Sequence, residues 1–196
     1  MITSRERLIE SMTPWGRPMG TQIFAEGIVF YLTEDRDGFK LSSERNAEVH
    51  ALWRTETGWY EEGEEWAVVV FTYPERFTNR ERALAHQTLK ACRPLEYERI
   101  SGQVLAPGDS EKKDELAFQE QHKADWVVLE ALRSLDHPGM LECTARLGGS
   151  QRYSQVRRYL VPEKEYRGRS RFGFVIDERR HTLTARCEVL DPRGLG

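Results

Sequence analysis

The sequence predicts an α+β protein with two small antiparallel sheets, the first with several flanking helices and the second with few. Short runs of β-branched and aromatic residues occur in both halves of the 196-residue chain, and the clearest helix-capping signals lie before residue 105. The stretch GQVLAPGDSEK at 102–112, with two glycines and a proline, is typical of a linker. We therefore predict two domains, an α+β domain with an acidic hairpin at 1–105 and, at 106–196, a helix followed by a basic antiparallel sheet domain.

The first domain begins with both helical and extended patterns. A helix is predicted at 5–12, and the prolines and glycines at 12–20 predict an ordered loop that Trp15 anchors. The serines at 42–43 are suitable N-caps for a helix at 44–52. Between these helices, strand-forming runs separated by turn residues predict a three-stranded meander at 22–25, 28–33 and 39–41.

The stretch GWYEEGEEWAVVVF places four glutamates around one glycine. We predict a hairpin here, in which Trp59 and its neighbour end one strand and 61–65 form a loop with Gly63 at a positive φ. The following six residues, 66–71, are all apolar, which predicts a central strand covered on both faces.

Two further helices are predicted from local signals. Thr78 and Glu81 form a T-x-x-E capping box, which predicts that a helix begins there and is stopped by Pro94. A short helix at 95–100 is expected to end at Gly102.

In the second domain, a polar helix is predicted at 110–123. The pattern WVVLEALRSL from Trp126 fits a helix by its length, but its start and the DHPG turn that follows favour a strand, paired with the alternating MLECTARL. We predict the strand. The remaining predicted elements are a strand at 156–161, a helical turn at 162–166 and a last apolar strand at 172–177.

Composition and motifs limit the classes of function. No apolar run approaches the length of a membrane span and charged residues follow the start closely, so we expect a cytoplasmic protein without membrane contact. The three cysteines, Cys92, Cys143 and Cys187, lie far apart and are expected to be small buried hydrophobes. The sequence contains no phosphate-binding, dinucleotide-binding, zincin or nucleophile-elbow motif, so we expect no cofactor, no metal and no enzymatic activity. The alternative is an enzyme whose scattered histidines, such as His50 and His86, are brought together by the fold.

The acidic stretch is the first candidate site. Glutamates in an exposed loop are ionised, whereas a general acid near neutral pH needs a raised pKa, which argues against catalysis there. Negative charge beside large aromatic rings suits contact with a basic patch on another protein. The alternative is a solvated turn with both rings buried. The predicted protein-binding residues are Trp59, Glu61, Glu62, Glu64, Glu65 and Trp66.

The basic second half is the other candidate. Residues 1–139 have a charge balance of −8 and residues 140–196 a balance of +5, within a net charge of −3. Arginines that alternate with aromatic residues suit phosphate contact and base stacking, although nearby acidic residues dilute the charge and exposed strand-face arginines are the alternative. The predicted nucleic-acid-binding residues are Arg152, Arg157, Arg158, Arg169 and Arg171.

Several motifs resemble those of a family of short proteins encoded by proteobacterial plasmids, integrative elements and prophages. They are TPWG, GIVFY, GFKLSSERNA, GWYEE, EWA, FTYPERF and the long RRYLVPEKEYRGRSRFGFVIDERRH, and the likeness covers most of the chain. The resemblance carries over no activity or catalytic residue; it implies a setting in mobile-element cargo, where small proteins often counter restriction and CRISPR systems. We therefore expect an anti-defence inhibitor that binds a host protein or nucleoprotein complex, with a nucleic-acid-binding accessory protein of the element as the alternative.

Overall fold

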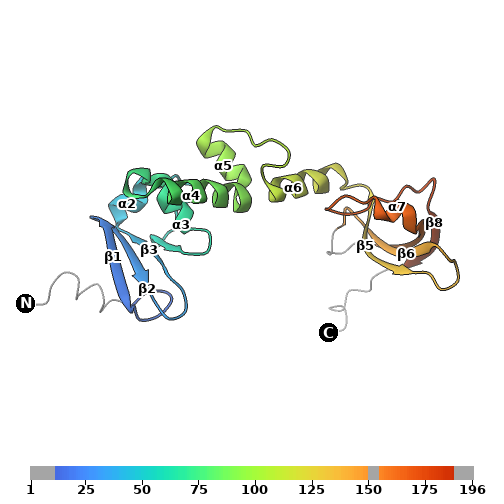
Figure 1. The fold of residues 1–196 in the computed structure, drawn as a ribbon, viewed down its shortest axis with the longest axis horizontal. Coiled ribbons are helices and arrows are strands. Elements are labelled where there is room, and N and C mark those ends of the chain that lie inside the picture. The colour runs from blue at the N-terminus through green and yellow to red at the C-terminus, as the bar shows by residue number, and fades with distance from the viewer. Residues whose placement is uncertain (1–11, 150–154, 188–196) are drawn as a thin grey trace, which may run out of the picture. The chain divides into compact units, whose positions relative to one another are not determined.

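The computed structural model describes residues 12–149 and 155–187 (Figure 1). The chain divides into two compact units, Met1–Lys113 and Asp114–Gly196, called unit 1 and unit 2 below. Each unit contains one four-stranded antiparallel sheet, and most of the helices belong to unit 1. The α+β class with two antiparallel sheets is therefore confirmed. The helix predicted at 5–12 falls almost wholly outside the described residues.

The sheet of unit 1 is a meander in the order β1-β2-β3-β4. Its register places Phe39 between Phe30 and Tyr60 on neighbouring strands, and these rings face the helices that cover the sheet. The predicted three-strand meander is confirmed and gains a fourth strand. The bounds are β1 (Gly20–Ala25), β2 (Ile28–Leu32), β3 (Gly38–Leu41) and β4 (Trp59–Glu61).

In the described part of unit 1, four α-helices and a 3₁₀ turn accompany the sheet. They are α2 (Ser43–Glu48), α3 (Trp66–Thr72), η1 (Pro74–Arg76), α4 (Asn79–Cys92) and α5 (Pro94–Ser101). Ser42 caps α2, the capping box of Thr78 and Glu81 is present at α4, and Gly102 ends α5 with φ 72°. These local signals were predicted correctly. α2 ends sooner than the predicted 44–52, because Val49 leaves the helix with an extended backbone.

The strand predicted at 66–71 is wrong, because this run forms helix α3. The four residues Ala67–Val70 are at most 1% exposed and pack between the sheet and α4, with Tyr60 and Leu89 in the same core. A run that is apolar on every side fits a fully buried helix as well as a fully buried strand, and the packing outweighs the β preference of valine. The acidic segment therefore connects a strand to a helix and is not a hairpin loop. Gly63 has no positive φ.

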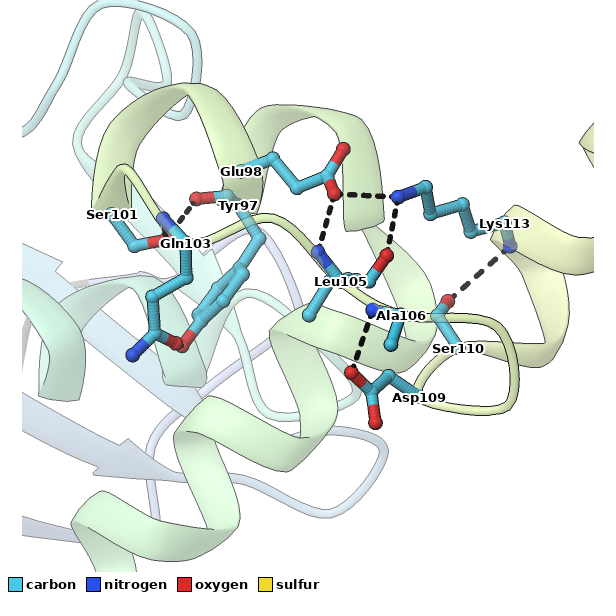
Figure 2. A network of polar contacts seen from close by, with 9 residues as sticks. All are labelled: Tyr97, Glu98, Ser101, Gln103, Leu105, Ala106, Asp109, Ser110 and Lys113. Carbon is cyan, nitrogen blue, oxygen red and sulfur yellow. Dashed lines mark hydrogen bonds and ion pairs between the residues drawn. The ribbon is translucent and has the colours of Figure 1, made fainter.

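The loop after α5, where the linker was predicted, is tied to unit 1 by a polar network (Figure 2). Glu98 Oε1 accepts a hydrogen bond from the Leu105 N–H at 2.6 Å and from Lys113 Nζ at 2.6 Å, and Lys113 Nζ also donates to the Leu105 carbonyl at 2.7 Å. Leu105 and Ser110 are each 3% exposed. The predicted boundary at 105/106 lies within this loop, while the compact units divide at 113/114, within α6 (Glu111–Gln121).

The sheet of unit 2 is also a meander, in the order β5-β6-β7-β8, with one short helix after β7. Its core contains Trp126, Cys143, Tyr159 and Val161, and the strand chosen at Trp126 is confirmed. The bounds are β5 (Trp126–Arg133), β6 (Met140–Leu147), β7 (Val156–Pro162), α7 (Glu163–Arg167) and β8 (Thr182–Cys187).

The last strand predicted at 172–177 is wrong, because the fourth strand of this sheet is β8. The apolar segment covers the core beside β5, where the Val128 N–H donates to the Phe174 carbonyl and the Ile176 N–H to the Trp126 carbonyl, and only an isolated bridge forms. β8 is an edge strand with polar residues such as Thr182 and Thr184, so hydrophobicity did not mark it. In the part of the chain that the structure describes, no helix is both long and apolar enough to cross a membrane.

Candidate functional site

The acidic turn, Glu61–Glu65, joins β4 to α3 in unit 1, and three of its four carboxylates are held by other groups of that unit. Arg36 Nη1 lies 2.7 Å from Glu61 Oε1. Arg93 donates to Glu64 Oε1 from Nε at 3.0 Å and from Nη2 at 2.8 Å. Glu65 accepts the Glu61 backbone N–H at 3.1 Å and lies 3.5 Å from Arg93. The net negative charge that the turn presents to a partner is therefore smaller than its sequence indicates.

These contacts keep the Glu64 carboxylate ionised. The hydrogen bonds from the Arg93 guanidinium lower the pKa of Glu64 below its ordinary value of 4.5, and burial opposes this only in part. A general acid near neutral pH needs a shift in the other direction. The electrostatics at Glu64 thus suit ion pairing and do not suit proton donation.

Glu62 differs from its three neighbours. Its side chain is exposed, and within the described residues its carboxylate makes no hydrogen bond or ion pair. It borders a hollow, called the acidic hollow below, whose other lining residues are Asp35, Arg36, Asp37, Glu61 and Gly63. Asp37 is partly committed, because its Oδ1 accepts the Thr33 N–H at 2.8 Å. Glu62 is therefore the carboxylate of the acidic turn that is available to a partner.

Glu62 also borders a second hollow, called the aromatic cavity below, with a volume of about 420 Å³. This volume lies within the range of ligand pockets, roughly 300–1,000 Å³. The polar lining residues are Gln22, Glu62 and Glu81. The main apolar ones are Phe24, Phe30, Phe39, Trp66, Phe77 and Leu84.

The two predicted tryptophans lie on opposite sides of the sheet. Trp66 lines the aromatic cavity on the helix-covered side. Trp59 alternates in β4 with the fully buried Tyr60 and so faces the other side, where its ring centroid lies 5.5 Å from that of Trp15 and 5.3 Å from that of Tyr31. The predicted six residues therefore do not form one surface, and the structure brings Trp66 together with Glu62 only.

The predicted basic residues of unit 2 also have different environments. Arg157 stacks over the Trp126 ring at 4.0 Å and pairs with Glu178 at 2.5 Å, and its side chain is 20% exposed. Arg158, the next residue in β7, is exposed, and Arg152 lies outside the described residues. Arg157 is therefore a packing residue, whereas Arg158 faces solvent.

The two remaining arginines, Arg169 and Arg171, are exposed but lie over aromatic rings of the same unit. Arg169 lies 4.9 Å from the Tyr166 ring and Arg171 5.1 Å from the Phe172 ring. The guanidinium groups thus cover rings that were expected to stack on bases. The alternation of arginine and aromatic residues predicts intramolecular cation–π pairs as well as it predicts a nucleic-acid surface.

A third arrangement, around His181, was not predicted. The imidazole is 5% exposed; its Nδ1 accepts the Asp177 N–H at 3.0 Å and its Nε2 lies 3.3 Å from Glu165 Oε2. Arg180 also pairs with Glu165, at 2.8 Å. These contacts attach the segment before β8 to α7. Among the described residues no group of three or more His, Cys, Asp or Glu side chains is arranged so that it could hold a metal ion.

Sequence reasoning missed the aromatic cavity because its residues come from β1, β2, β3, α3 and α4 and carry no motif. A protein-family model, Domain of unknown function (DUF7007), matches residues 9–123, which is more than half of the chain. No curated protein and no solved structure matches.

Proposed function

We propose that this chain, which belongs to the DUF7007 family, acts by binding another macromolecule without catalysis, as an anti-defence inhibitor carried by a mobile genetic element. The observation that supports binding is an exposed carboxylate, Glu62, which has no partner among the described residues and lines both the acidic hollow and the aromatic cavity. Charge at a rim steers encounter, and an apolar pocket beside it supplies affinity. The mobile-element setting comes from the resemblance of the motifs.

The partner of this proposal is a host defence complex, of the CRISPR or restriction type, that presents a basic surface. Complexes of these types bind DNA or RNA with basic grooves, so a negatively charged protein surface competes for the same contacts. Because Arg36 and Arg93 offset two of the three negative charges of Glu61, Glu64 and Glu65 within unit 1, much of the charge that meets the partner comes from Glu62 and from Asp35, which lines the same hollow.

The test is to mix the protein with purified defence complexes and to measure association and inhibition of DNA cleavage. Glu62→Gln is expected to weaken binding by about tenfold, equivalent to about 1.4 kcal/mol, mainly through a slower association rate. Glu56→Gln removes the same charge from an exposed position outside both hollows and is the matched control. Failure to associate with any such complex argues against the inhibitor, and equal affinity of the two variants removes the acidic turn from the contact.

The second candidate, a nucleic-acid-binding accessory protein, is favoured by the exposed Arg158, Arg169 and Arg171 in unit 2. It predicts retention of labelled DNA or RNA, with an affinity that falls steeply as salt rises. Charge reversal at these three arginines should abolish retention. Arg157 is left out of this variant because its reversal would break the Trp126 stack and the Glu178 pair.

A further inference from the structure

We propose that the aromatic cavity receives an apolar side chain of a partner polypeptide, and that Glu62 contacts a lysine or arginine next to that side chain in the partner. This deepens the proposed function, because it rests on a protein partner and names the chemistry that the site recognises. The cavity belongs wholly to unit 1, so the site is complete within that unit.

The floor of the cavity is a preformed cluster of rings. Phe24 contacts Phe39 and Phe77 with centroid separations of 5.3 and 4.9 Å, and Phe39 lies 5.9 Å from Phe77. These rings come from β1, β3 and the segment before α4, so their packing also holds the sheet to the helices. A ligand therefore meets an apolar floor whose rings already pack against one another, so that binding needs little further ordering of the protein.

The rim of the cavity is accessible. Leu84 on α4 is 50% exposed, and Trp66 at the start of α3 is partly buried. An apolar side chain that enters the cavity covers ring surface of Phe24 and Phe77, which are only partly buried. Burial of such surface stabilises a complex by about 25 cal/mol per Å² before the costs of association.

The charges on the cavity wall favour a cationic neighbour for that side chain. Glu62 and Glu81 line the cavity, and among the described residues no lysine or arginine does. Glu81 is committed to the capping box: hydrogen bonds from Thr78 lower its pKa, so it is ionised, and its Oε2 accepts the Thr78 N–H at 2.7 Å. A phosphate or carboxylate is repelled here, whereas a lysine or arginine gains a partner in Glu62 and the attraction of nearby ring faces.

The two hollows that meet at Glu62 argue for a polypeptide and against a small molecule. Glu62 lines both the aromatic cavity and the acidic hollow, whose lining also includes Asp35 and the ion pair of Arg36 with Glu61. A ligand that fills both has an apolar part and a positive part next to one carboxylate. Neighbouring apolar and basic residues in an extended segment have this layout.

The experiment uses the full chain labelled with 5-fluorotryptophan and observed by ¹⁹F NMR, with the Trp66 signal assigned from Trp66→Phe. The probes are the blocked dipeptides N-acetyl-Phe-Arg-amide, N-acetyl-Phe-Glu-amide and N-acetyl-Gly-Arg-amide. The Phe-Arg probe is expected to shift the Trp66 signal with a dissociation constant on the order of 1 mM. It should bind at least about threefold more tightly than either of the other two probes. The Trp59 signal, from the opposite side of the sheet, should not move.

Two variants test the site itself. Leu84→Tyr places a ring at the accessible rim and should abolish the shift of the Trp66 signal. Glu62→Gln should remove the preference for Phe-Arg over Phe-Glu, while the matched Glu56→Gln should keep it. The proposal is overturned if Trp66 does not respond up to about 10 mM Phe-Arg, if Phe-Glu binds equally well, or if Leu84→Tyr binds like the unmodified protein.

The outcome is separable from that of the proposed function. If the dipeptide binds as described but no defence complex associates, the inhibitor proposal fails and the cavity assignment stands. If a defence complex binds Leu84→Tyr with unchanged affinity, the cavity assignment fails and the inhibitor proposal stands.

Discussion

The contact between Arg93 and Glu64 decides how much of the acidic turn is free to bind, and its strength is measurable. We expect a double-mutant cycle with Arg93→Met and Glu64→Gln to give a coupling free energy of about 1 kcal/mol at low salt. Charge-assisted hydrogen bonds contribute about 1.5–3 kcal/mol, and exposed ion pairs about 0.2–1 kcal/mol. The Arg93 side chain is 22% exposed and that of Glu64 44%, so solvent screening reduces the value to the border between these ranges.

The assay is urea denaturation followed by tryptophan fluorescence. Four of the five tryptophans, Trp15, Trp53, Trp59 and Trp66, belong to unit 1, so the signal reports mainly on the unit that contains the pair. At about 1 M salt the coupling should fall, because the Debye length is then only about 3 Å.

A second cycle supplies the control. Arg93→Met with Glu62→Gln should give a coupling near zero, because Glu62 has no partner among the described residues. A coupling below about 0.3 kcal/mol for Glu64, or an equal value in both cycles, would refute the reasoning that Arg93 offsets the charge of Glu64.

Three further predictions concern local chemistry. Thr78→Ala removes the hydroxyl that accepts a hydrogen bond from the Glu81 N–H. Urea denaturation should then show a loss of about 1 kcal/mol in the free energy of unfolding of unit 1. No measurable loss would contradict the role of the capping box. Burial raises the pKa of the Cys143 thiol to about 11. Iodoacetamide at pH 8 should therefore leave this residue unlabelled in the folded protein and should label it in guanidinium, as measured by peptide mass spectrometry. Rapid labelling of the folded protein would contradict this burial. The pKa of Glu64 is lowered on folding, so the stability that Glu64 contributes is fully present above its ordinary pKa of 4.5 and is lost as the pH falls through the folded value. The difference in free energy of unfolding between the unmodified protein and Glu64→Gln should therefore shrink in acid. A difference that does not change with pH would contradict the ion pair.

The sequence by itself determined the elements whose signals are local. The capping box at Thr78, the N-cap at Ser42 and the helix end at Gly102 each depend on backbone groups a few residues away, so they act in the same way whatever the rest of the chain does. The alternation in Met140–Leu147 likewise identified a strand with one solvated face. The fold class followed from these elements.

Only the tertiary structure decided the features that depend on what covers a segment. Whether 66–71 became a helix or a strand was set by its burial between the sheet and α4, because an apolar run carries no periodicity to distinguish the two. The polar strand β8 joins the sheet because its backbone pairs with the free edge of β7. In the candidate site, Arg36 and Arg93 reach the acidic turn from 25 and 29 residues away, and the aromatic cavity gathers five elements. Such long-range contacts produce no recognisable residue spacing in the sequence, because the residues meet only when the chain adopts its tertiary structure.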